Sequence, residues 1–386
     1  MKIPKLVLNS RLHRSMAILL LAECAGLSLW TQGQSPSVAP GTAQSEALPD
    51  PTKPEVQPPL NIDRDPISSP DREVVPPPAP ALAMNQGPSK LEKTQNGLYT
   101  LHAEVDEVLL NCTVIDAKGR TVNGLTKDDF RVWEDGVPQP INSVVHEDLP
   151  VSMGILVDNS GSMRDKRGAV NAAAFNLLKD SNPQDEAFVV NFADRAYLDQ
   201  GFTTNLVALD RGLSRFDSKG TTALYDAVAA SADELSKHAK RRKEVLLIIT
   251  DGADNASHLS LQEAIRRVQN LGGPVVYCVG LLFDTEGEET QRARNALEML
   301  SEETGGIAYF PRSLQEVNGI AAQVARDIRN QYTVDYHSTK PERLGGYRTV
   351  RVEAYSPRLG KLNVRTKKGY YAKAEPTSFV VQEAKQ

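Results

Sequence analysis

Three short stretches rich in side-chain oxygen lie far apart in the sequence. The first reads DNSGS from Asp158, the second GTTA from Gly220 and the third TDG from Thr250. Each combines short oxygen-bearing side chains with glycine or another small residue. Such side chains suit a hard cation such as Mg²⁺, which prefers oxygen ligands in near-octahedral geometry and keeps some of its water. The candidate metal ligands are Asp158, Ser160, Ser162, Thr222 and Asp251.

Residues 149–331 alternate strand-like and helical patterns, and two of the strands lead into these loops. The apolar run Val151–Val157 precedes the first loop, and Glu244–Thr250 leads into the third. Several strands are apolar throughout, as expected when helices cover both faces of a sheet. We therefore predict an α/β domain with an open, doubly wound, mostly parallel, Rossmann-like sheet and Tyr197–Phe202 as an antiparallel edge. Ligands bind beyond the carboxyl ends of the strands in such sheets, so the three loops should meet there.

The mixture of hydroxyls and carboxylates predicts how a bound ion would behave. Ser160, Ser162 and Thr222 would be neutral ligands. If Asp158 and Asp251 act mainly through water or from behind these hydroxyls, the ion keeps much of its positive charge. It would then bind an external carboxylate strongly at an open position, helped by the backbone N–H groups at the start of the following helix. This describes a metal-dependent adhesion site and not a closed structural metal.

The three motifs together resemble the von Willebrand factor A (VWA) domain with its metal-ion-dependent adhesion site (MIDAS). DNSGS, GTTALYDA and ITDG occur in the family's order, and the resemblance covers about residues 149–331. It implies that the five candidate ligands hold a divalent ion, usually Mg²⁺, with Mn²⁺ or Ca²⁺ as alternatives. It also implies a protein partner whose Asp or Glu carboxylate completes the coordination. Thr221 stands where relatives often have Gly, and we assign the ligand to Thr222 because Ala-Leu follows it.

A metal-dependent hydrolase is the main alternative to a binding function. His258 lies near Asp251 in the sequence and could serve as a base, with Ser160 or Ser162 as the nucleophile. However, the sequence has no Gly-x-Ser-x-Gly elbow, and Gly272-Gly273 lacks the spacing of a phosphate-binding loop. We therefore predict that the protein is not an enzyme. A structural envelope component with an incidental metal is a further alternative.

The first 97 residues predict export followed by a tether. Residues 1–33 have a basic start and a mostly apolar core, Met16–Trp30, as in a secretory signal peptide. This core is short for a membrane span, so we prefer a cleaved signal to an uncleaved anchor or a wrongly assigned start. Residues 34–97 are rich in proline and polar residues and should form a disordered tether. The expected location is the periplasm, the cell surface or the extracellular space.

Two β-rich segments flank the α/β domain, at residues 98–148 and 332–373, and a frayed tail covers 374–386. Alternating apolar residues and the hairpin signal Glu134-Asp135-Gly136 support this reading. Each segment is too small to be stable alone, so we predict that they pair into one β-sandwich into which the α/β domain is inserted. The flanks also resemble those of secreted VWA-related proteins of Acidobacteria.

Charge and cysteine content limit the partners. The chain has 44 Lys and Arg against 49 Asp and Glu, a net charge of −5, which gives no electrostatic case for nucleic acid. A membrane would be a partner only if the signal segment stays as an anchor.

Cys112 and Cys278 lie in apolar runs and should be small buried hydrophobes, with a bridge between them as the alternative in an oxidising compartment. The oligomeric state is not predicted.

Overall fold

The computed structural model describes residues 107–372 except 147, 216, 271, 342 and 343, together with the backbone of two short paired strands, β1 (Glu92–Lys93) and β2 (Tyr99–Thr100). The predicted signal peptide, most of the predicted tether and the predicted tail lie outside these residues. Within the described part of the chain, no helix is both long enough and apolar enough to span a membrane.

A six-stranded sheet forms the centre of the α/β unit. In spatial order its strands are β12 (Ala308–Tyr309), β11 (Val275–Gly280), β10 (Lys243–Thr250), β7 (Val151–Asp158), β8 (Glu186–Phe192) and β9 (Ala196–Thr203). Neighbouring strands are parallel except β9, which runs antiparallel to β8 at the edge. The mostly parallel sheet with an antiparallel edge strand is therefore confirmed.

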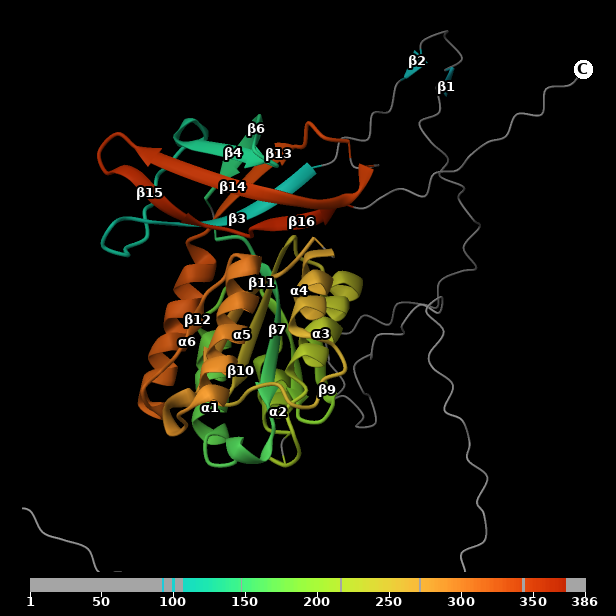
Figure 1. Ribbon diagram of the computed structural model, residues 1–386, viewed down its shortest axis with the longest axis vertical. Coiled ribbons are helices and arrows are strands. Elements are labelled where there is room, and N and C mark those ends of the chain that lie inside the picture. The colour runs from blue at the N-terminus through green and yellow to red at the C-terminus, as the bar shows by residue number, and fades with distance from the viewer. Residues whose placement is uncertain are drawn as a thin grey trace, which may run out of the picture. The chain divides into compact units, whose positions relative to one another are not determined.

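Helices cover both faces of this sheet (Figure 1). One face packs against α1 (Arg167–Lys179), α2 (Leu206–Leu213) and α6 (Leu314–Arg329). The other packs against α3 (Leu224–His238), α4 (Leu261–Asn270) and α5 (Glu288–Thr304). The short 3₁₀ turns η2 (Gly161–Met163) and η3 (Leu282–Asp284) follow β7 and β11.

The two faces explain why β7 is apolar at nearly every position. Ile155 and Val157 face one helical layer, whereas Leu156 faces the other. Gly154 is required by packing, because a Cβ there would lie 2.5 Å from Cζ of Phe188. A strand buried on both faces needs no alternation, as the sequence predicted.

The segments before and after the α/β unit form one antiparallel sheet of eight strands. The earlier segment contributes β3 (Glu107–Ile115), the turn η1 (Lys127–Asp129), β4 (Phe130–Glu134), β5 (Val137–Gln139) and β6 (Ile141–Val145). The later segment contributes β13 (Tyr332–His337), β14 (Gly346–Ser356), β15 (Gly360–Arg365) and β16 (Gly369–Ala372). Because β3 pairs with both β13 and β15, the predicted joining of the two segments is confirmed.

The predicted β-sandwich is corrected to this single sheet. The difference arises because β3 and β14 are long enough to change neighbours along their length. β3 pairs with β13 through Cys112 and with β15 from Thr113 onward, and β14 pairs in turn with β16, β4 and β15. The strands are thus joined into one continuous sheet around its own core, which includes Leu110, Phe130 and Tyr332.

The two described cysteines are buried and unbridged. Cys112 lies in the core of the eight-stranded sheet, and Cys278 lies between the six-stranded sheet and its helices. Burial raises the pKa of Cys112 to about 12, which keeps this thiol protonated at neutral pH. Both side chains act as small apolar core residues, as predicted.

A buried polar cluster connects α6 to the eight-stranded sheet. Asp327 on α6 accepts a hydrogen bond from the Tyr277 hydroxyl at 2.6 Å and forms an ion pair with Arg365 of β15. Gln331 donates to the same tyrosine hydroxyl at 3.0 Å. The end of α6 is therefore held by β11 and β15 together.

The burial of Lys243, at the start of β10, should make the stability of the fold depend on pH. It is 5% exposed and donates to the carbonyl of Ile328, and burial lowers its pKa from 10.5 to about 8. Between these two values the unfolded chain binds more protons than the folded chain, so stability rises with pH. The free energy of unfolding of wild type minus that of Lys243→Met should therefore increase from pH 8 to 10.5, by up to roughly 3 kcal/mol.

Chemical denaturation across this pH range measures the difference. Lys179→Met, at an exposed position in the last turn of α1, is the control and should give a flat difference curve. An equally flat curve for Lys243→Met would contradict the prediction.

Candidate metal site

The first and third predicted loops meet at the carboxyl edge of the six-stranded sheet. β7 and β10 are adjacent parallel strands that end at Asp158 and Thr250. The Thr250 hydroxyl donates to Oδ2 of Asp158 at 2.6 Å, and the Ser162 hydroxyl donates to Oδ1 of Asp251 at 2.8 Å. Ser160 Oγ lies 3.1 Å from Ser162 Oγ. The backbone N–H of Ser160 also donates to Oδ1 of Asp158 at 2.8 Å, so hydrogen bonds join four of the five predicted ligands.

The second loop is held between the other two by its backbone. The N–H of Gly161 donates to the carbonyl of Gly220 at 3.5 Å. Gly220 has φ +89°, a left-handed conformation that favours glycine. On the other side, Thr222 donates its N–H to Oδ1 of Asn255 at 2.8 Å, and Asn255 donates its own N–H to the Thr222 carbonyl at 3.0 Å. Thr222 thus lies at the same edge, although within the described contacts no hydrogen bond joins its hydroxyl to the other four side chains.

Asp158 is the most enclosed of the five residues. Its side chain is fully buried; Oδ1 accepts the backbone N–H of Ser160 at 2.8 Å, and Oδ2 accepts the Thr250 hydroxyl. Burial raises the pKa of this carboxyl to about 6, although both hydrogen bonds act in the opposite direction. A carboxylate that accepts hydrogen bonds on both oxygens is suited to orient the hydroxyl ligands and to supply negative charge without binding the ion directly.

The donor set fits a hard divalent ion. All five predicted ligands offer oxygen only, and three of them are hydroxyls. Within the described residues, no group of three or more His, Cys, Asp and Glu side chains could hold a metal, so a site rich in thiol or imidazole ligands is not formed there. Oxygen ligands of this kind suit Mg²⁺ or Mn²⁺ better than a soft cation.

Three residues that were not among the five predicted ligands support the site. Thr250 binds Asp158, and Asn255 binds Thr222, as described above. Lys166, directly before α1, donates to Oδ2 of Asp251 at 2.8 Å. The position of Thr250 at a strand end next to Asp251 could have suggested its role, whereas nothing local in the sequence pairs Lys166 with Asp251.

His258 has a different partner from the one a hydrolase would require. Its Nδ1 lies 2.9 Å from Oδ2 of Asp226 on α3, and its side chain is 83% exposed. Among the contacts that the structure describes, none joins His258 to Ser160 or Ser162. The residue's backbone N–H also donates to Asp226, so this acid holds the loop that follows β10 against α3.

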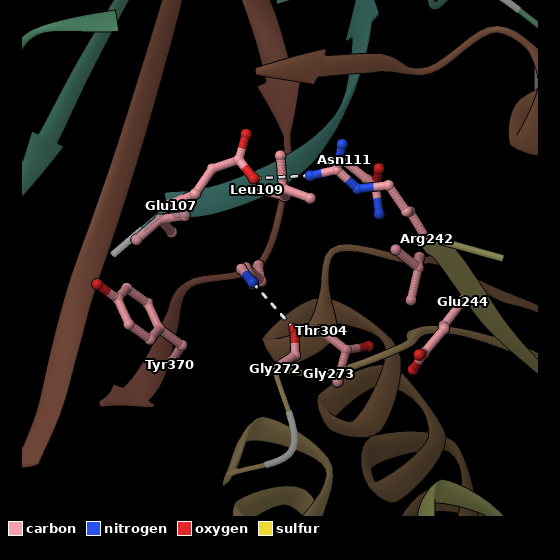
Figure 2. A pocket seen from close by; sticks show the side chains of 12 residues that line it. Glu107, Leu109, Asn111, Arg242, Glu244, Gly272, Gly273, Thr304 and Tyr370 are labelled. Carbon is pink, nitrogen blue, oxygen red and sulfur yellow. Dashed lines mark hydrogen bonds and ion pairs between the residues drawn. The ribbon is translucent and has the colours of Figure 1, made fainter. Parts of the chain in front are cut away.

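A cavity lies at the other edge of the sheet, away from the three loops. Its volume is about 250 Å³, and it is lined from β3, from the start of β10 and from the segment around Lys367. Figure 2 shows side chains that line it. An ion pair of 2.7 Å joins Arg242 and Glu107 at its border, and Lys367 Nζ donates to the Gly272 carbonyl at 3.2 Å. Since Arg242 precedes β10 and Asp251 follows it, the cavity is separate from the candidate metal site.

Comparison with known families supports the identity of the α/β unit. Residues 153–253 match the family model described as the von Willebrand factor type A domain, and this span contains all five predicted ligands. The resemblance seen in the motifs is therefore confirmed for this part of the chain. No curated protein matches the chain in sequence.

Three solved structures that resemble this chain are similar to it at low sequence identity. A von Willebrand factor type A protein from Catenulispora acidiphila is 15% identical with a TM-score of 0.42, over 63% of this chain and 72% of that one. Proximal thread matrix protein 1 from the mussel byssus, with a zinc-occupied MIDAS motif, is 18% identical with a TM-score of 0.42, over 51% of this chain and 50% of that one. The PilB minor pilin from Streptococcus sanguinis is 11% identical with a TM-score of 0.40, over 63% and 84%.

Proposed function

We propose that the von Willebrand factor type A domain of this chain binds a protein partner through a divalent ion that takes up a carboxylate of that partner. The observation that carries the proposal is the meeting of three loops with neutral hydroxyls and hydrogen-bonded carboxylates at one sheet edge. Asp158, Ser160, Ser162, Thr222 and Asp251 would hold the ion, Mg²⁺ first and Mn²⁺ or Ca²⁺ as alternatives. The ion would supply a Lewis-acidic position for the partner's Asp or Glu.

The hydrogen bonds favour capture of an anion over permanent closure of the site. Asp251 accepts from Ser162 on one oxygen and from Lys166 on the other, as Asp158 does from Ser160 and Thr250. Carboxylates committed in this way neutralise an ion less than directly bound ones would. The ion would then retain charge for an external carboxylate, which supports binding rather than catalysis.

Export belongs to the same proposal. A signal peptide followed by a proline-rich tether would place the domain in the periplasm, on the cell surface or outside the cell. There it could meet acidic side chains of envelope or extracellular proteins. A pull-down from the native envelope with Mg²⁺ should retain a partner that EDTA releases, and retention that EDTA does not affect would contradict the proposal.

A threonine pair gives a matched test of the ligand set. Thr222 is buried beside the third loop, whereas Thr221 is exposed. Thr222→Val removes a hydroxyl at nearly constant shape and should weaken Mg²⁺ binding by about 10–100-fold, as measured by isothermal titration calorimetry. Thr221→Val should leave Mg²⁺ affinity unchanged. The opposite pattern would move the ligand to Thr221, and no effect of either change would exclude the second loop from the site.

A further inference from the structure

Lys166 places a buried ammonium group directly on a carboxylate of the candidate metal site. The residue is 9% exposed, and its Nζ lies 2.8 Å from Oδ2 of Asp251. The same Nζ lies 3.4 Å from Oδ2 of Asp284 in η3 and 5.6 Å from the centre of the Phe283 ring. A lysine held by two acids and an aromatic ring has a defined position, so its charge acts steadily on the site.

We propose that Lys166 sets the charge of the metal site, weakening its hold on the ion and strengthening the attraction of the loaded site for an anionic partner. This inference rests on the proposed function, because it assigns a specificity-determining residue to the same site. The fixed charge of Lys166 acts on the site through its contact with Asp251.

The charge balance supports this role. Two site carboxylates, Asp158 and Asp251, would neutralise a divalent ion completely. The ammonium of Lys166 cancels one of these negative charges, so the ion, the two carboxylates and Lys166 together carry a net positive charge. Asp284 does not restore the balance, because its side chain is 58% exposed and its charge is screened by water.

The hydrogen bonds lead to the same conclusion. Oδ2 of Asp251 is occupied by Lys166, and Oδ1 accepts the Ser162 hydroxyl. Asp251 is therefore poorly placed to donate an oxygen directly to an ion, which leaves coordination to neutral hydroxyls and water. The neighbouring Arg167 adds positive potential, since it donates to the backbone carbonyl of Asp158 at 3.1 Å.

Two affinities should consequently change in opposite directions when the charge is removed. Lys166→Met should bind Mn²⁺ about tenfold more tightly than wild type, because a cation near the ion has been removed. At saturating Mn²⁺, the same variant should bind acetate several-fold more weakly. Calorimetry measures the metal affinity, and paramagnetic relaxation of the acetate methyl protons by bound Mn²⁺ measures the anion affinity.

Two further variants separate charge from structure. Lys166→Gln removes the charge but keeps a donor for Asp251, and it should reproduce both changes if the methionine variant is unstable. Lys166→Arg keeps the charge and should leave both affinities close to those of wild type. A loss of packing alone would weaken both affinities together.

The outcomes distinguish this inference from the proposed function. A wild-type protein that binds no Mn²⁺ would overturn the proposed function itself. The role of Lys166 alone would be overturned if the wild-type protein binds Mn²⁺ and acetate but the neutral Lys166 variants leave both affinities unchanged or weaken both. Tighter metal and weaker acetate binding in both neutral variants is the result we expect.

Discussion

Asp158→Ala should lower the affinity of the protein for Mg²⁺ by about 100-fold or more, and binding of an acidic partner should be lost with it. The reason is that the change removes a negative charge from the site and two hydrogen bonds that orient it. Without Asp158, neither the backbone N–H of Ser160 nor the hydroxyl of Thr250 keeps its acceptor. Calorimetry with Mg²⁺ and an EDTA-sensitive pull-down measure the two effects.

Asp158→Asn is the control for folding. Burial raises the pKa of Asp158 to about 6, which means that the ionised carboxylate destabilises the metal-free fold at neutral pH. The neutral amide should therefore leave the free energy of unfolding in EDTA unchanged or higher, while Mg²⁺ binding is still lost. Mg²⁺ affinity in Asp158→Asn equal to that of wild type would argue against a charged metal site.

Arg348→Met should destabilise the eight-stranded sheet by about 3–5 kcal/mol, because it leaves the buried Glu134 without its cation. Both side chains are 1% exposed and lie 3.2 Å apart. Glu134 also accepts the hydroxyls of Tyr336 at 2.7 Å and Tyr370 at 2.9 Å, so its position is fixed by three strands. The charge cannot relax into water when the guanidinium is removed.

Tryptophan fluorescence in a urea titration can follow this change, because Trp133 lies next to Glu134 in β4. The double variant Glu134→Gln with Arg348→Met should recover part of the loss, since no charge then remains buried. Lys361→Met removes an ion pair whose lysine is 75% exposed and should cost less than about 1 kcal/mol. A loss as small as this in Arg348→Met would show that the buried pair contributes little.

Much of the α/β unit was predictable because its signals are local. The uninterrupted apolar run of β7 reflects burial on both faces, and the weaker run of β9 at the edge was expected to be antiparallel. The first and third site motifs follow β7 and β10 directly, so their place at the carboxyl edge depends only on the sheet being parallel.

The shape of the flanking β segments was not predictable in the same way. Alternating residues showed which segments form strands, but they do not show which strand pairs with which. β3 finds its partners more than 200 positions later, in β13 and β15, and this choice produces one sheet and not a sandwich. Pairing at such separation depends on the whole fold.

The sequence by itself determined the chemistry of the candidate site: the oxygen ligands, their order, and the strands that lead into two of the three loops. Only the tertiary structure decided which charges meet there. Lys166 and Asp251 are 85 positions apart, and the start of α1, which Lys166 directly precedes, must pack beside the end of β10 before their side chains touch. Ligand type is a property of single residues, whereas the charge of a site is the sum over every residue that the fold brings near it.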